Sequence, residues 1–161
     1  MTGASVDPLD RIVAVEEIKK LKARYFRCID TKDFAGLLDV FAADATSEEV
    51  GTPGVIEGNE AISSSIGQWL RTVQTVHHGF LPEIDIDDRT WARGIWAFED
   101  RLWGWPPGES AGALYGYGHY HETYTRTDEG WRIATMRIER IRVDVALVGT
   151  TSVVGISLPP L

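Results

Sequence analysis

The sequence predicts an α+β fold in which three N-terminal helices cover one face of a curved, mainly antiparallel sheet. Helical spacing of apolar residues dominates the first 71 residues, interrupted by one short strand expected at 46–50. From residue 73 to residue 145 the spacing changes to the alternation that is typical of strands. Helices followed by an antiparallel meander indicate the α+β class. A curved sheet with helices across its concave side forms a cone, and we expect a pocket at its mouth.

Three segments carry the helical pattern. The first helix is expected over residues 9–29, and Asp30 closes it. One stripe of this helix is predicted to be buried because its members recur at steps of three and four: Ile18, Leu21, Tyr25 and Cys28. A second helix is expected at about 34–41, and Asn59 caps a third over residues 60–71.

Five longer strands are expected at 73–80, 83–86, 91–103, 114–125 and 131–145. Successive side chains of a strand point to opposite faces. On the first of these strands we expect Val76, His78 and Phe80 to face the interior and His77 to face outward.

The same alternation sorts the side chains of the later strands. On the strand at 91–103, the more aromatic face is expected to be interior, and it holds Trp96, Phe98 and Asp100. On the strand at 114–125, one face holds Tyr115, Tyr117, His119 and His121. The last strand brings Arg140.

Length and composition limit the classes of function. A chain of 161 residues fits one domain, expected over 1–161 with a core at about 9–145 and a tail at 146–161. The net charge of −8 argues against nucleic acid or an anionic membrane surface as a partner. No apolar run is long enough for a membrane span, and the N-terminus lacks the pattern of a signal peptide. We therefore expect a cytoplasmic protein.

A histidine on an apolar interior face is either a packed core residue or a catalytic base. A base needs a carboxylate to hold its tautomer, a dry cavity, and a hydrogen-bond donor across the substrate. Asp30, the aromatic pocket and Tyr25 supply these for His78 if the fold brings them together, with an Asp30 oxygen about 2.6–3.2 Å from a His78 ring nitrogen. His119 and His121 could ligate a metal, but no motif supports one, and we predict neither metal nor cofactor.

Several segments together resemble the SnoaL-like group of the nuclear transport factor 2-like superfamily. In chain order they are residues 25–30 (YFRCID), 41–45 (FAADA), 76–78 (VHH), 116–124 (GYGHYHETY) and 130–133 (GWRI). The resemblance covers about residues 9–145. It implies the same α+β cone.

Within this superfamily the pattern is most similar to three lyases: scytalone dehydratase, bile-acid 7α-dehydratase and lindane dehydrochlorinase. The resemblance to the last two implies that Asp30, at the end of the first helix, forms a dyad with a catalytic His78. Tyr25 stands where the bile-acid enzyme has a Tyr.

The resemblance also implies residues that contact the substrate. Either Asp100 or Glu99 corresponds to the second Asp of the bile-acid enzyme, and Arg140 to its last-strand Arg. Either His119 or His121 corresponds to the second His of scytalone dehydratase.

The expected function is that of a cofactor-independent lyase, of the dehydratase type, acting on a small hydrophobic cyclic or polycyclic substrate. His78 would remove a proton, Asp30 would activate it, and Tyr25 would donate a hydrogen bond to the leaving hydroxyl or to a carbonyl. The residues expected to contact the substrate are Asp100, Arg140, His119, His121, Trp96, Phe98 and Tyr117. The alternatives are an isomerase or polyketide-type cyclase, and a non-catalytic binding protein. We also expect a homo-oligomer, a trimer or a dimer.

Overall fold

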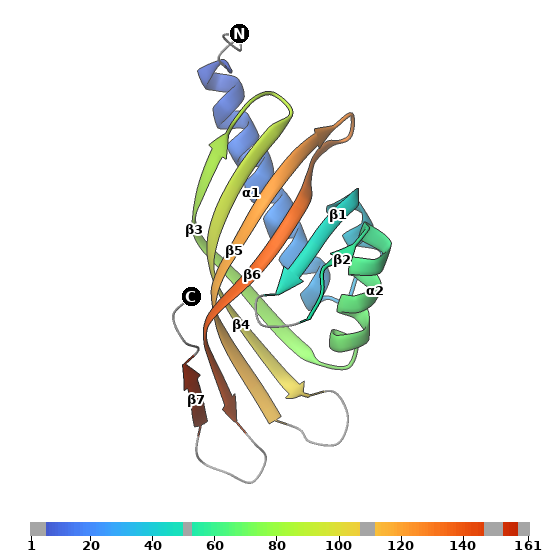
Figure 1. Ribbon diagram of the computed structural model, residues 1–161, viewed down its shortest axis with the longest axis vertical. Helices are drawn as coiled ribbons and strands as arrows, with labels where there is room; N and C mark the ends of the chain where they lie inside the picture. The colour runs from blue at the N-terminus through green and yellow to red at the C-terminus, as the bar shows by residue number, and fades with distance from the viewer. Residues whose placement is uncertain (1–5, 50–52, 107–111, 147–152, 158–161) are drawn as a thin grey trace.

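The computed structural model describes residues 6–49, 53–106, 112–146 and 153–157. One strongly curved sheet forms the body of the protein, and the long helix α1 (Pro8–Asp30) lies along one of its faces (Figure 1). The shorter helix α2 (Asn59–Leu70) packs beside β1 (Phe41–Glu49). The predicted α+β class is confirmed, with helices set against a curved sheet.

The described chain contains two α-helices where we predicted three. The segment expected as a helix at about 34–41 holds only a 3-10 turn, η1 (Gly36–Asp39), and the chain is already extended at Phe41. Leu37 and Val40 are fully buried. A spacing of three residues is satisfied by a single 3-10 turn, so these side chains reach the core without a helix.

The sheet has seven strands in the described residues: β1, β2 (Ile56–Glu57), β3 (Gln74–Ile86), β4 (Trp91–Trp105), β5 (Gly112–Thr127), β6 (Gly130–Ala146) and β7 (Val153–Ser157). Their order is β2-β1-β6-β5-β4-β3, and β7 pairs with β6. β1 runs parallel to β6, while the other neighbouring strands are antiparallel. Register shifts leave extra residues in β3, opposite β4, and in β6, opposite β5, and such bulges increase the bend of a sheet.

The core lies between α1 and the face of the sheet that it covers. The predicted stripe of α1 is buried along its whole length: Ile18, Leu21, Tyr25 and Cys28. Aromatic rings fill the space beneath the helix. Tyr25 and Phe26 meet Tyr120 of β5 at centroid distances of 6.0 and 5.9 Å, and the Phe98 ring lies 4.4 Å from Tyr120.

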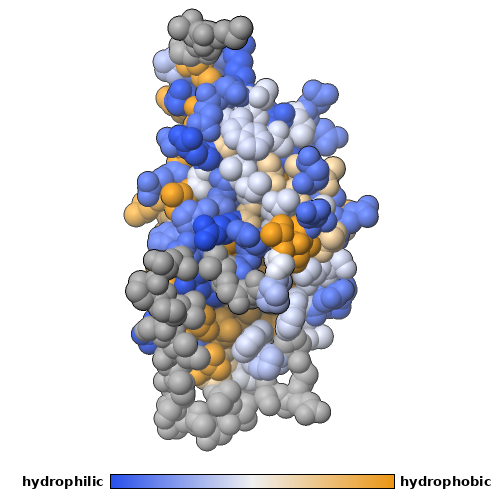
Figure 2. Space-filling view, in the orientation of Figure 1, coloured by the Kyte–Doolittle hydropathy of each residue, from blue (hydrophilic) through white to orange (hydrophobic). Residues whose placement is uncertain are grey.

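The opposite face of the sheet is left open by α1, which lies behind the long strands in Figure 1. Figure 2, in the same orientation, shows hydrophobic side chains among hydrophilic ones on this outer face. A groove of about 530 Å³ also opens here, and its lining includes Arg93, Ile95, His121 and Arg137.

Two further predictions concern membrane-spanning segments and the C-terminal tail. In the described chain, no helix is both long and apolar enough to cross a membrane. The tail predicted at 146–161 contains β7, which extends the sheet beside β6. The other tail positions, 147–152 and 158–161, lie outside the described residues.

Candidate active site

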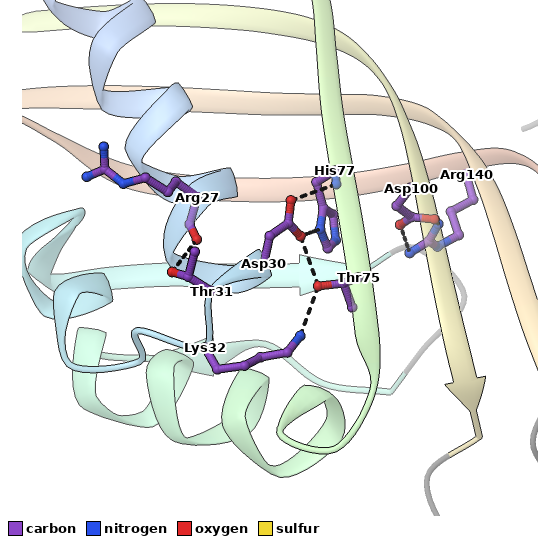
Figure 3. Close-up of polar contacts among 8 residues, drawn as sticks. All are labelled: Arg27, Asp30, Thr31, Lys32, Thr75, His77, Asp100 and Arg140. Atoms are coloured by element: carbon purple, nitrogen blue, oxygen red, sulfur yellow. Dashed lines mark hydrogen bonds and ion pairs between the residues drawn. The ribbon is translucent and has the colours of Figure 1, made fainter.

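The C-terminal end of α1 places Asp30 against β3, where it binds His77. The Asp30 Oδ1 and the His77 Nδ1 are 2.7 Å apart, and the His77 backbone N–H donates to Oδ2 at 3.0 Å (Figure 3). The Thr75 hydroxyl donates to Oδ1 at 2.9 Å. Asp30 and His77, named here the Asp30–His77 dyad, have the carboxylate–imidazole separation that a general base requires.

The hydrogen bonds of Asp30 fix the tautomer of His77. Burial alone would raise the pKa of the Asp30 carboxyl, but the hydrogen bonds and charge of His77 and the Thr75 hydroxyl lower it. An ionised carboxylate has no proton to donate, so the ring Nδ1 of His77 must be the donor. The Nε2 of the neutral ring is then left with its lone pair, as a base requires.

The predicted pairing of Asp30 with His78 is wrong, because β3 turns His77 to the interior and His78 to the outer face. The His78 side chain is 50% exposed and its Nδ1 lies 3.2 Å from Glu99 Oε1. The His77 side chain is 6% exposed, and its ring stacks on Phe26 at 6.1 Å and an interplanar angle of 12°.

Phe26 gives the physical reason for this phase. A Cβ added to Gly79 would lie 2.8 Å from the Phe26 ring. The Phe26 side chain of α1 therefore fills the apolar space against this face of β3, and the strand needs a small residue at position 79. The sequence carried this signal, since a glycine inside a strand marks a close approach of a neighbour. Gly79 shares a face with His77.

A buried ion cluster lies on β4 and β6 beside the dyad. Asp100, 2% exposed, is the cross-strand partner of His77, and Figure 3 shows its carboxylate paired with Arg140. The two Asp100 oxygens accept from the Arg140 guanidinium at 3.2 and 2.9 Å, and Arg140 also pairs with Glu49. Burial alone would lower the pKa of Arg140, but both carboxylates raise it. Arg140 therefore stays a cation.

Of the two acidic positions left open on β4, the structure turns Asp100 inward and leaves Glu99 with His78 and Arg101 on the other face. Trp96 and Phe98 lie on the interior face, as the alternation predicted. Their contact with a substrate stays a prediction.

Tyr25, predicted as a hydrogen-bond donor, lies in the aromatic core. It is 2% exposed, with Phe41 and Tyr120 packed edge-on against its ring. Burial, and after it the negative charge of Glu122, raises the pKa of its hydroxyl far above the usual range, so Tyr25 stays protonated. The Phe26 ring contacts both Tyr25 and His77, which places this phenol one ring away from the dyad.

Sequence reasoning missed a second polar group under α1. Lys22 donates to Glu122 Oε1 at 2.5 Å, the Tyr124 hydroxyl donates to Oε2 at 2.6 Å, and the Trp96 indole N–H donates to the Tyr124 oxygen at 2.8 Å. We call these four residues the buried lysine cluster. The Lys22 ammonium lies 3.4 Å from the centroid of Tyr120, a favourable cation–π distance.

The charge of Lys22 depends on this surrounding. Burial lowers the pKa of Lys22 to about 8, against the attraction of Glu122. The lysine was overlooked because a long side chain in a helical stripe is usually taken as solvated, and its partner lies 100 residues away.

Tyr117, His119 and His121 were expected to contact the substrate, and the structure places them on the outer face of β5. Tyr117 is 37% exposed, and His121 Nε2 lies 3.5 Å from Glu139. The interior positions belong to Gly116, Gly118, Tyr120 and Glu122. A Cβ on Gly116 would collide with Arg140 and Asp100, so the ion cluster requires a glycine there, and the alternation turns the three larger side chains outward.

Comparison with known proteins places this geometry in a family. Residues 10–137 match the model of the SnoaL-like domain. Among solved structures, a Mycobacterium tuberculosis protein of unknown function is similar at 27% identity, with a TM-score of 0.70 over 85% of this chain and 78% of that chain.

Two further neighbours share the fold at lower identity. A protein of Novosphingobium aromaticivorans, provisionally assigned as a scytalone dehydratase, is 18% identical, with a TM-score of 0.71 over 88% of this chain and 97% of its own. The hexachlorocyclohexane dehydrochlorinase LinA-type3 of Novosphingobium barchaimii is 16% identical, with a TM-score of 0.70 over 96% of this chain and 100% of its own.

Proposed function

Since the chain belongs to the SnoaL-like domain family, we propose that it is a lyase that eliminates water or another small leaving group from a small hydrophobic molecule. The observation that carries the proposal is the 2.7 Å contact between Asp30 and His77. Its hydrogen-bond directions leave His77 Nε2 free to accept a proton. The two neighbours assigned as a dehydratase and a dehydrochlorinase are named for eliminations, which supports the same class of reaction.

The reaction step follows from the dyad. His77 Nε2 removes a proton from carbon, the electrons of the broken C–H bond form the new double bond, and the leaving group departs with its own bonding pair. Asp30 stabilises the imidazolium that forms. When hydroxide leaves, it takes up a proton and is released as water.

The surroundings of the dyad indicate the substrate class. Phe26 stacks on the His77 ring, and Phe98 is the cross-strand partner of Gly79, so the side chains beside the dyad are apolar rings, which suits a small hydrophobic cyclic substrate. Arg140 is a permanent cation on the interior face, next to Asp100, the cross-strand neighbour of His77. We assign it to the stabilisation of negative charge that develops on a substrate oxygen after proton removal. Tyr25 remains the candidate donor to the leaving group.

The proposal is tested with β-hydroxy ketones of one to three rings, because these have an acidic C–H beside the carbonyl and a hydroxyl that can leave. Mass spectrometry of the product separates elimination, which loses the mass of water, from isomerisation or cyclisation, which does not. His77→Ala is expected to lower the rate by about 10²- to 10⁴-fold, the usual contribution of a general base.

His78→Ala is the matched control, because it removes the neighbouring imidazole from the outer face of the same strand. This variant is expected to keep the wild-type rate. Full activity of His77→Ala, or an equal loss in His78→Ala, contradicts the proposed mechanism. Binding of the ketones with no product from any of them indicates a binding protein instead.

A further inference from the structure

Lys32 occupies a backbone position that favours glycine. It follows the last turn of α1 with a φ of 63°, while its N–H donates to Ile29 O and the Asp33 N–H donates to Cys28 O. This closing turn usually takes glycine, because a side chain in the left-handed region is strained. A lysine here is held against its backbone preference, and such strain is often found at functional sites.

The side chain of Lys32 reaches back to the dyad. Its ammonium donates to Thr75 Oγ1 at 2.9 Å, and Thr75 Oγ1 donates to Asp30 Oδ1 at 2.9 Å (Figure 3). An ammonium can only donate, and a hydroxyl carries one proton. The Lys32 contact therefore leaves the Thr75 proton for Asp30, and the direction of each hydrogen bond from Lys32 to Asp30 is determined.

Thr75 and the His77 ring donate to the same oxygen of Asp30. Thr75 is 6% exposed, so an alternative water partner has little access to its hydroxyl. With the Lys32 ammonium removed, the Thr75 oxygen loses its donor and Asp30 loses a neighbouring positive charge. The Thr75–Asp30 hydrogen bond then holds the carboxylate less firmly in place against the His77 ring.

We propose that Lys32 is a positioning residue for the Asp30–His77 dyad, acting through the hydroxyl of Thr75. This inference rests on the proposed function. The ammonium orients the Thr75 proton toward Asp30, and the carboxylate in turn holds the His77 ring in the tautomer with a free Nε2. The strained backbone at Lys32 is retained because glycine, which suits the turn better, has no ammonium.

Four variants test this inference: Lys32→Met, Lys32→Gly, Thr75→Val and Lys32→Met/Thr75→Val. Lys32→Met is expected to lower kcat about tenfold with little change in KM, a loss typical of second-layer hydrogen-bond partners. In the Thr75→Val background the same substitution is expected to have no further effect, because the hydroxyl through which Lys32 acts is gone. Lys20→Met, at an exposed position of α1, is the control and is expected to match wild type.

Lys32→Gly separates activity from stability. We expect it to lower kcat as Lys32→Met does while the Tm stays equal or rises, because glycine relieves the strained backbone. A lysine with only a structural role would lower the Tm and kcat together. That outcome would overturn the inference.

A measurement without substrate distinguishes this inference from the proposed function. The ¹⁵N chemical shifts of the His77 ring at neutral pH report which nitrogen carries the proton. We expect the Nδ1–H tautomer in wild type and a mixture of tautomers in Lys32→Met. An unchanged spectrum in Lys32→Met overturns the positioning role. A higher KM in Lys32→Met that also appears in the Thr75→Val background overturns it too, and indicates direct contact of Lys32 with substrate. If His77→Ala proves fully active while Lys32→Met still changes the His77 tautomer, the proposed function is wrong and the effect of Lys32 on His77 stands.

Discussion

The Asp30–His77 dyad and the buried lysine cluster both lie between α1 and the sheet, and they differ in their access to solvent. The Asp30 side chain is 24% exposed, whereas the side chains of Lys22 and Glu122 are 1% and 0% exposed. Proton exchange with a ligand requires a group that the ligand can reach. Within the dyad the His77 side chain is 6% exposed, and Asp30 provides the access to solvent at the end of the helix. The cluster is enclosed and fixes how the middle of α1 packs on the sheet.

This difference in exposure predicts that removal of a partner changes stability in the cluster and reaction rate in the dyad. A buried charge that loses its counterion destabilises the fold, because nothing compensates its lost hydration. A partly exposed group that loses its partner is rehydrated, and the loss appears in the chemistry. Substitutions in the cluster should therefore change the free energy of unfolding most, and substitutions in the dyad should change the reaction rate.

The largest stability effect is expected for Lys22→Met. It leaves the buried Glu122 carboxyl without its cation and with only the Tyr124 hydroxyl as donor, and should lower the free energy of unfolding by about 3–5 kcal/mol. Urea unfolding measures the change. The double variant Lys22→Met/Glu122→Gln removes both charges and should recover most of the loss. A loss below 1 kcal/mol in Lys22→Met would show that the cluster is hydrated and would remove the contrast with the dyad.

A smaller effect is expected for Tyr124→Phe. The hydroxyl links Trp96 to Glu122, so its removal leaves one buried N–H and one carboxylate oxygen without a partner. We expect a loss of about 1–3 kcal/mol in the free energy of unfolding. Tyr117→Phe, on the outer face of the same strand, is the matched control and should change it by less than about 0.5 kcal/mol. Equal losses in both would contradict the assignment of the interior face of β5.

The smallest effect is expected for Asp30→Asn, and it depends on pH. The pKa of Asp30 is lower in the folded state than in the unfolded chain, so the unfolded chain binds more protons as the pH falls. Its contribution is therefore fully present above about pH 4 and is lost as the pH drops through the lowered pKa. Because Asp30 is partly exposed, we expect a contribution of about 1 kcal/mol or less.

Urea unfolding of wild type and Asp30→Asn between pH 3 and pH 7 measures this term. The difference between the two proteins should be constant above pH 5 and shrink toward pH 3. A difference that grows toward pH 3 would mean that the carboxylate is destabilised in the folded state, against the hydrogen bonds that we assign to it.

The sequence predicted the interior face of β4 correctly and the interior faces of β3 and β5 wrongly. β4 has neighbours on both sides, and its aromatic face, with Trp96 and Phe98, is the interior one as expected. β3 is the last strand of the order, and its outer side chain Phe80 is 46% exposed. An edge strand tolerates apolar residues on its solvent side, so hydrophobicity alone chose the wrong phase and selected His78 in place of His77.

Packing between distant segments accounts for the other differences. The stripe of α1 follows from local spacing and was predicted, as was the place of Asp30 at its end. The glycine face of β5 is interior because Arg140 crosses it, and Lys22 is buried because Glu122 receives it. Both facts depend on contacts between residues far apart in the chain, which periodicity does not contain.

The close approach of Phe26 to Gly79 has a consequence for engineering the interior. The same ring that leaves no room for a Cβ at position 79 also stacks on the base of the dyad. A methyl group at Gly79 would displace that ring and tilt the imidazole with it, although it touches neither Asp30 nor His77. Gly79 thus limits the chain's capacity to evolve a larger interior. A library aimed at larger substrates should vary Phe26 and Gly79 together.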